Sequence, residues 1–432
     1  MDPAITTLCV LAVAAFLFVT ELIPLAVTAM AACTALGILG VLPSKQVYAG
    51  LSNSTVVLFG GMFVIGAAMF KTGLAEAVGL WVVNKAGTKE VPLMGAIMVV
   101  TIALSAVSSN TGTVACLMPV IVGIANAAHI PASKELMPLA VAANVGGTIT
   151  MIGTPPNVIV TGALSAAGLP SFGFFEFALI GVPLSVIVLV YMLTIGRKTI
   201  PIKNAGAMDA AAVEAAKKEA GASDDNAPKS KTKMWISGLI LLGVVAAMAL
   251  NLKTVPLQTA AVTGAILCVI TGCLKEKEAY AGIDWVTIFL FAGMLSVATA
   301  MDKTGAGKLI ADTVVGMMGE NPNPIVLCAV LYLISNVLTQ FMSNTASAAL
   351  LAPIGISIAQ SIGADPKPVL MSIGIAASMA FATPMATPPN TLVLGPGGFN
   401  FNDYVKVGVP LCIITFIASV IIIPIFWPFF PG

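Results

Sequence analysis

The stretch SSNTGT at residues 108–113 decides how the first part of this chain folds. It interrupts an apolar run that otherwise extends from Pro92 to Ile124. Neither arm reads as a full membrane crossing, so the pattern predicts a re-entrant hairpin over about residues 92–128, with the polar stretch at its tip. Backbone left unpaired at that depth is tolerated only where it is buried in protein or lines a wet cavity. A second hairpin is expected over about 325–362, around Ser343-Asn344-Thr345.

A second kind of interruption follows each hairpin. GTPPN occupies residues 153–157 within an apolar segment over about 136–164, and ATPPN occupies 386–390 within a segment over about 367–395. Two successive prolines remove two N–H donors and disfavour helix in the residue before them. We therefore expect each helix to break here. The upstream half would keep free carbonyls, and the downstream half would begin with an electropositive end.

These motifs belong to an internal duplication. The Lys-Thr-Gly sequence at 71–73 recurs at 303–305, a shift of 303 − 71 = 232, and the Ser-Asn-Thr and Thr-Pro-Pro-Asn motifs recur at shifts of 234 and 233. The matches predict a first repeat over 1–200, a linker over 201–233 and a second repeat over 234–432. Duplicated halves with broken helices are typical of secondary transporters, which bind substrate near the membrane midplane. An odd number of crossings per half would invert one repeat relative to the other.

The composition is that of an integral membrane protein. Of 432 residues, 58% are apolar and 9% charged, with a mean hydropathy of +1.01, whereas soluble domains carry about 25% charged residues. The apolar runs predict about ten to twelve crossings of the lipid bilayer, some of them broken. A net charge of +1 gives no indication of a nucleic-acid partner. Seven scattered cysteines and one histidine offer no metal cluster, no catalytic residues and no sign of an organic cofactor.

One long polar stretch divides the chain. Between Arg197 and Lys233 there are eight Lys or Arg residues and five Asp or Glu residues. Basic residues next to membrane segments favour the cytoplasmic side, because their translocation is disfavoured. The linker over 201–233 is therefore expected in the cytoplasm.

The interruptions suit both a cation and an anion. Free carbonyls, amide oxygens and hydroxyls suit a dehydrated hard cation such as sodium, whereas helix N-termini and hydroxyl donors suit anionic oxygens. Arg197 is the single arginine, and no lysine lies in a hairpin tip or helix break. A dianion would therefore have no fixed basic partner. Sodium ions bound beside it are the simplest counter-charge.

Residue spacing supports one cation site in each half. Ser105 lies four residues before Ser109, which places both on one helix face, one turn below the tip. Thr339 and Ser343 repeat this spacing in the second half. No acidic residue reads as a proton relay within the membrane, which disfavours proton coupling.

The two Ser-Asn-Thr tips, each followed some 45 residues later by Thr-Pro-Pro-Asn, resemble the divalent anion/sodium symporter family of dicarboxylate and citrate carriers. The resemblance covers essentially the whole chain. It implies an all-α membrane protein with about eleven transmembrane helices and two re-entrant hairpins in two inverted repeats. It also implies a homodimer with a scaffold domain at the dimer interface and a transport domain that moves as an elevator.

The resemblance further implies the site residues. The first sodium would be held by Ser105, Ser109, Asn110 and the Gly153 carbonyl, and the second by Thr339, Met342, Asn344 and the Ala386 carbonyl. The substrate would contact Ser109, Asn110, Thr111, Thr154, Pro155, Ser343, Asn344, Thr345, Thr387 and Pro388. Only a backbone oxygen can contribute at Met342. The resemblance also implies that exchanger branches of the family place a basic side chain where sodium would bind, and the matched positions in this chain have none.

These features predict a secondary active transporter that couples the entry of about two or more sodium ions to uptake of a small divalent anion. The foremost candidate is a C4 dicarboxylate such as succinate. A sulfate or other inorganic dianion carrier and a citrate carrier are alternatives, because the motifs do not fix substrate length. A membrane-embedded enzyme lacks a visible nucleophile, base or metal cluster, and channels are usually built from repeated subunits around a pore. We expect a homodimer in the plasma membrane, the inner membrane of a bacterium.

Overall fold

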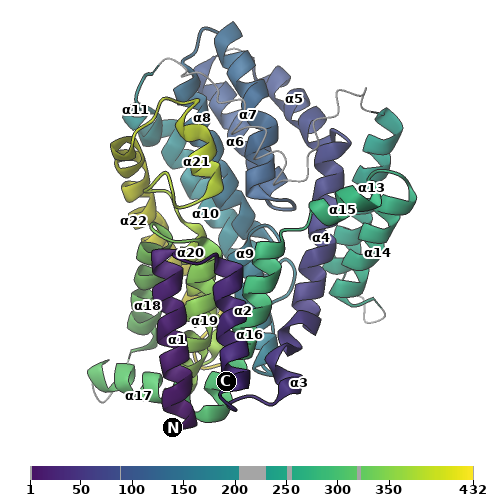
Figure 1. Ribbon diagram of the computed structural model, residues 1–432. Coiled ribbons are helices and arrows are strands. Elements are labelled where there is room, and N and C mark those ends of the chain that lie inside the picture. Colours follow the sequence, from purple (N-terminus) through teal and green to yellow (C-terminus); the bar gives the residue numbers. More distant parts are fainter. Residues whose placement is uncertain (1, 88, 204–229, 251–254, 319–322, 432) are drawn as a thin grey trace.

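The computed structural model describes residues 2–87, 89–203, 230–250, 255–318 and 323–431, and all regular structure in these ranges is helical (Figure 1). Residues 204–229 of the predicted linker lie outside them. The elements before the linker are α1 (Pro3–Thr20), α2 (Leu25–Ile38), α3 (Ser44–Val47), η1 (Ala49–Ser52), α4 (Ser54–Lys71), α5 (Leu74–Ala86), α6 (Glu90–Ser105), α7 (Asn110–Ala127), α8 (Ala132–Gly146), η2 (Gly147–Ile149), α9 (Pro155–Ala166), α10 (Ala178–Tyr191), η3 (Met192–Gly196) and α11 (Arg197–Thr199). Those after it are α13 (Lys231–Ala249), α14 (Leu257–Ile270), α15 (Glu276–Ala281), α16 (Trp285–Thr304), α17 (Ala306–Met318), α18 (Pro324–Thr339), α19 (Asn344–Ser361), α20 (Pro366–Ser378), α21 (Pro388–Leu394) and α22 (Phe401–Phe426).

Several of these helices can cross a membrane. In the described ranges, seven helical segments are long and apolar enough to do so: α1, α4, α7, Ala178–Thr199, α13, α16 and α22. Helix α7 is the second arm of the first predicted hairpin, so the expectation that neither arm could be a full crossing was wrong for this arm by length and composition. Four shorter apolar helices accompany them: α2, α6, α14 and α18. Outward-facing side chains are apolar as well, and the equivalent residues Ile38 and Ile270 are 80% and 74% exposed. The prediction of an all-helical membrane protein is confirmed.

The helix boundaries fall at the motifs. In the first hairpin region α6 ends at Ser105 and α7 begins at Asn110, and in the second α18 ends at Thr339 and α19 begins at Asn344. The proline motifs open α9 at Pro155 and α21 at Pro388. Proline is well suited to the first helical turn, where its missing N–H would have no partner within the helix.

Two equivalent helix pairs join the repeats, and in each pair a helix of one repeat packs against a helix of the other. Helix α4 packs on α14, and α16 packs on α2. A Cβ atom on Gly61 of α4 would lie 2.7 Å from the carbonyl carbon of Ala261, and one on Gly293 of α16 would lie 2.7 Å from that of Ala29. Only glycine permits so close an approach of two backbones. In Figure 1, α5 and α17, which follow α4 and α16, lie at the top and the bottom of the molecule.

Polar side chains near the ends of α4 and α16 also contact the other repeat. Lys71, at the end of α4, forms an ion pair with Glu278 of α15. Lys303, near the end of α16, donates to Gln46 Oε1 of α3 at 2.7 Å. Because 303 − 71 and 278 − 46 both equal 232, the two contacts join equivalent positions of the repeats. It is an ion pair in one place and a hydrogen bond to a neutral amide in the other.

The Lys71–Glu278 pair makes a prediction about acid stability. Burial alone would raise the pKa of Glu278, but the Lys275 backbone N–H and the Lys71 ammonium outweigh burial and lower this pKa below its ordinary 4.5. A lowered carboxyl pKa stabilises the fold above the unfolded value, and the contribution is lost as pH falls through the folded value. Glu278→Gln should therefore lower the melting temperature at pH 7 by about 1–3 °C, and the difference from the unaltered protein should vanish near pH 3.

Thermal unfolding in detergent between pH 3 and pH 7 measures this difference. The matched variant is Gln46→Glu, which offers Lys303 a carboxylate at the equivalent place and should raise the melting temperature at pH 7. A difference between Glu278→Gln and the unaltered protein that stays constant across the pH range would show that the carboxylate charge is not what stabilises the contact.

Candidate functional site

Each hairpin tip is bonded to the helix break of its own repeat. The Thr150 hydroxyl donates to the carbonyl of Ala106. At the equivalent place, the Thr383 hydroxyl donates to the carbonyl of Gln340 at 2.5 Å. We call a hairpin tip and the helix break of its own repeat a half-site. The two half-sites lie next to each other, because α9 packs on α19 and α20, while α21 packs on α7 and α8. The sequence motifs of both repeats are therefore gathered in one region of the fold.

The unwound segments are held by the asparagines that end the proline motifs. Asn157 Nδ2 donates to the carbonyl oxygens of Gly147 at 3.4 Å and Thr150 at 2.9 Å. Asn390 Nδ2 donates to those of Ala380 and Thr383, both at 2.9 Å. These bonds satisfy carbonyls that lose helical partners at the break. Both asparagines are buried, and in each break one amide holds two of the carbonyls.

The first half-site holds buried oxygen atoms without partners. Ser105 Oγ and Asn110 Oδ1 are both buried, and neither has a hydrogen-bond partner among the described residues. A Cβ atom on Gly147 would lie 2.8 Å from Asn110 Oδ1 and 2.9 Å from the Gly153 carbonyl oxygen. The Asn110 amide and the Gly153 carbonyl thus share one small volume, which exists because residue 147 is glycine. Ser109 Oγ caps α7 by accepting from the Gly112 N–H at 3.3 Å.

The second half-site has the same outline, but its groups bond to one another. Thr339 Oγ1 lies 2.5 Å from Asn344 Oδ1 and 2.7 Å from the Ala377 carbonyl oxygen, either of which can accept its single proton. Met342 and Ala386 are 3% and 4% exposed. Ser343 precedes α19 without a side-chain capping bond. The oxygens of this half-site are therefore better satisfied without a bound ion than those of the first.

Helix N-termini supply the donors for an anion. Asn110 and Asn344 open two 18-residue helices, so the N–H groups of Thr111 and Thr345 lie in their first turns. Thr154 precedes α9 without a side-chain capping bond. Thr387 Oγ1 accepts from the Asn390 N–H at 3.5 Å. The motif residues are all neutral, and the ion pairs Lys71–Glu278, Lys203–Asp403 and Lys367–Glu176 involve none of them.

Four further residues shape the site without having been predicted from the sequence: Gly147, Asn144, Asn157 and Asn390. Asn157 and Asn390 belong to the proline motifs, and their recurrence at one spacing after the prolines was a usable signal. No such signal marked Gly147 and Asn144, because the duplication does not repeat these residue types: their equivalents in the second repeat are Ala380 and Ala377.

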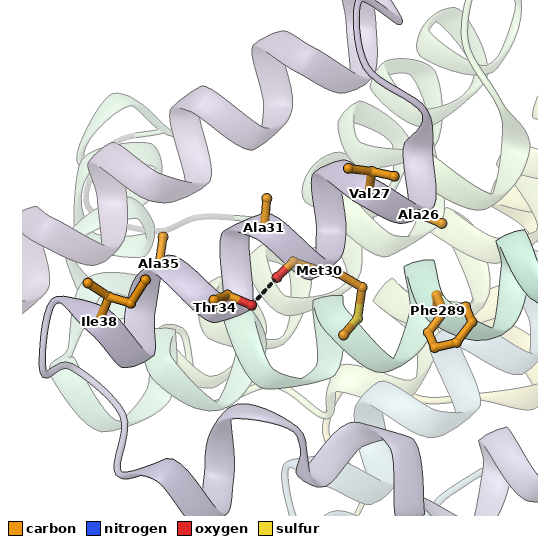
Figure 2. Close-up of a pocket in the computed structure, with 8 residues that line it drawn as sticks. All are labelled: Ala26, Val27, Met30, Ala31, Thr34, Ala35, Ile38 and Phe289. Atoms are coloured by element: carbon orange, nitrogen blue, oxygen red, sulfur yellow. Dashed lines mark hydrogen bonds between the residues drawn. The ribbon is translucent and has the colours of Figure 1, made fainter.

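A pocket of about 560 Å³ lies elsewhere, along the outer face of α2 (Figure 2). It is lined by Ala26, Val27, Met30, Ala31, Thr34, Ala35, Ile38 and Phe289. The Thr34 hydroxyl donates to the Met30 carbonyl of its own helix at 2.7 Å, so the lining offers a ligand little polar contact. No motif residue takes part, and we assign the pocket no role in substrate binding.

The helical fold and its long apolar helices define the class of this protein as a multi-pass membrane protein. Within that class, the chain belongs to the citrate transporter family (CitMHS), which it matches over residues 15–366. This match, together with a sodium-dependent relative, confirms the resemblance to divalent anion/sodium symporters.

Three relatives that align over nearly the whole of this chain support the assignment. The chain is 26% identical to the uncharacterised transporter YfbS of Escherichia coli, over 98% of this chain and 99% of the relative. It is 30% identical to an uncharacterised transporter of Haemophilus influenzae, over 97% and 91% of the two chains. It is 26% identical to the sodium-dependent dicarboxylate transporter SdcS of Staphylococcus saprophyticus, over 94% and 83%.

Two solved structures share the fold. The YdaH transporter of Alcanivorax borkumensis superposes with a TM-score of 0.67 at 14% identity, over the whole of both chains. MtrF of Neisseria gonorrhoeae superposes with a TM-score of 0.63 at 15% identity, over 91% of this chain and 84% of the other.

Proposed function

We propose that this protein couples the entry of sodium ions to uptake of a small divalent anion, foremost a C4 dicarboxylate such as succinate. The observation that carries the proposal is the first half-site, where Ser105 Oγ and Asn110 Oδ1 are buried without partners among the described residues and Asn110 Oδ1 lies beside the Gly153 carbonyl. A buried polar atom without a partner costs about 1–3 kcal/mol. A bound cation would remove that cost.

The available ligands favour sodium as this cation. Hydroxyl, amide and carbonyl oxygens are the ligands of hard cations, and a monovalent ion needs no carboxylate among them. We propose one sodium at Ser105, Ser109, Asn110 and the Gly153 carbonyl, and another at Thr339, Asn344 and the Met342 and Ala386 backbone.

The anion is proposed to bind between the two cation sites. Its carboxylates would accept from the Ser-Asn-Thr motifs that open α7 and α19, with Thr154, Pro155, Thr387 and Pro388 lining the site. Placing a carboxylate in a low-dielectric interior costs several kcal/mol even after relaxation. Because the motifs carry no positive charge, the two sodium ions supply the neutralisation, and transport of one species then requires the other.

The architecture proposed for this cycle follows the predicted repeats. We propose about eleven crossings and two re-entrant hairpins in inverted repeats over 1–200 and 234–432, a cytoplasmic linker over 201–233, and a homodimer in a bacterial inner membrane. The placement of α5 and α17 at opposite ends of the molecule supports the inversion (Figure 1). A transport domain carrying both half-sites would move as an elevator against the scaffold.

The names of the relatives favour a carboxylate substrate. SdcS is described as a sodium-dependent dicarboxylate transporter, and the family is described by citrate transport. We therefore place a dicarboxylate first and citrate second. Sulfate is third, because neither of these two descriptions names an inorganic anion.

The test is uptake of labelled succinate into proteoliposomes with and without an inward sodium gradient. We expect sodium to raise the initial rate by at least about tenfold over an equal gradient of choline, since an uncompensated dianion should not enter a neutral site. Unlabelled malate, citrate, tartrate and sulfate as competitors then rank the substrates. Uptake indifferent to sodium would refute the coupling, and competition by sulfate alone would refute the carboxylate.

A further inference from the structure

The two half-sites are not equivalent, and one of the differences between them lies in a single buried residue. Asn144 of α8 is 1% exposed, and its equivalent in the second repeat, by the shift of 233, is Ala377. Asn144 Nδ2 donates to Asn390 Oδ1 at 3.1 Å. Its Oδ1 accepts from the Thr387 hydroxyl at 3.3 Å. A residue of the first repeat therefore completes the helix break of the second.

The hydrogen bonds of Asn390 fix the orientation of the Asn144 amide. Asn390 Nδ2 already donates to two carbonyl oxygens, so Asn390 Oδ1 must face a donor. Asn144 must therefore present its NH₂ group to Asn390 and its oxygen to Thr387, since an amide has one donating and one accepting end. The assignment is set by the surrounding network.

The first repeat lacks this arrangement. Asn157 Nδ2 holds its unwound segment as Asn390 does, but Asn157 Oδ1 is buried without a partner among the described residues. The methyl group of Ala377 offers neither a donor nor an acceptor. The helix break of the second repeat is thus hydrogen-bonded to an asparagine of the first repeat, whereas the break of the first repeat has no such bond from Ala377.

The hydrogen bond to Asn144 determines whether the Thr387 hydroxyl can donate to a substrate. A hydroxyl has a single proton, and that of Thr387 is directed to Asn144. Thr154 has no equivalent acceptor, because Ala377 stands in that place. Of the two threonines proposed to line the anion site, Thr154 keeps its proton for an anionic oxygen, whereas Thr387 presents lone pairs.

We propose that Asn144 is a positioning residue for the second half-site, which orients Thr387 and Asn390 from the other repeat and makes the anion site asymmetric. The inference rests on the proposed function. It predicts that the affinities for anion and sodium depend on Asn144, although the residue need not touch either.

The experiment compares Asn144→Ala and Asn144→Leu in proteoliposomes, with initial rates divided by the amount of folded transporter. Leucine has the same branching as asparagine, so it removes both hydrogen bonds while keeping the shape. Either variant should raise the succinate KM and the half-saturating sodium concentration by about tenfold, which is the effect of one or two hydrogen bonds, while the maximal rate changes less than twofold. The sodium Hill coefficient should fall towards one.

Thr101→Val is the matched control, because Thr101 is fully buried on α6 and its hydroxyl bonds within its own helix. It should lower the melting temperature without moving either affinity. Unchanged affinities in a folded Asn144 variant would overturn the inference, and so would loss of folding in both variants while Thr101→Val folds. If the unaltered protein shows no sodium dependence, the proposed function itself fails and this inference falls with it.

Discussion

Asn110→Ala should lose all measurable sodium-driven uptake, and Asn344→Ala should do the same. Asn110 contributes a buried oxygen that has no partner among the described residues, and Asn344 contributes the oxygen that lies 2.5 Å from Thr339 Oγ1. Each side chain is proposed to serve both a sodium ion and the anion, so its removal weakens both. A lost hydrogen bond to a charged group costs about 1.5–3 kcal/mol, and two such losses reduce the coupled affinity by roughly 10²- to 10⁴-fold.

Labelled succinate uptake measures this effect, with size-exclusion profiles and melting temperatures to establish that the variants fold. Asn126→Ala is the matched control, because Asn126 lies on the same helix α7 but is exposed at its far end. It should transport normally. Full activity in either Asn110→Ala or Asn344→Ala would remove that residue from the site.

Gly153→Ala should be as severe, through the backbone. A Cβ atom on Gly153 would lie 2.4 Å from the Gly147 carbonyl oxygen. No side chain can rotate to relieve this contact, so the two edges of the break must separate. The Gly153 carbonyl then leaves its place beside Asn110, and we expect sodium-dependent uptake to fall by at least about 100-fold, since a misplacement of about 1 Å can cost that much.

Gly66→Ala on α4 controls for the substitution itself. A Cβ atom there meets no atom within 4 Å, and alanine favours helix over glycine by about 0.5–1 kcal/mol. Gly66→Ala should therefore transport normally and melt at the same or a higher temperature. Sodium-driven uptake by Gly153→Ala at the rate of Gly66→Ala would show that the close approach of residues 147 and 153 is not needed.

The sequence predicted those parts of the fold that depend on local chemistry. The apolar runs gave the class of protein, and the paired motifs gave the family, which the relatives confirm. Paired prolines cannot continue a helix from the preceding segment, and α9 and α21 do begin at Pro155 and Pro388. The individual site assignments at Asn110, Asn344 and their neighbours stay predictions until transport is measured.

Other features depend on contacts between distant residues and could not be predicted from sequence. Asn144 lies 246 positions from Asn390, and the duplication hides it, because Ala377 at the equivalent place makes the position look unimportant. The role of Gly147 depends on how closely Asn110 and Gly153 approach it. Neither approach is encoded in local spacing. The unequal hydrogen bonding of the two half-sites arises in the same way.

The close fit of Gly61 against Ala261 has a consequence for synthesis of the chain. These residues are 261 − 61 = 200 positions apart. At roughly 5–20 residues per second, α4 emerges about 10–40 s before the helix it packs against. During that interval Ala261 has not yet been made, so its place against Gly61 must be taken by other groups, such as lipid. The packing of α4 against α14 can therefore form only after the second half has been translated. The rate of translation limits how early the protein can complete its fold.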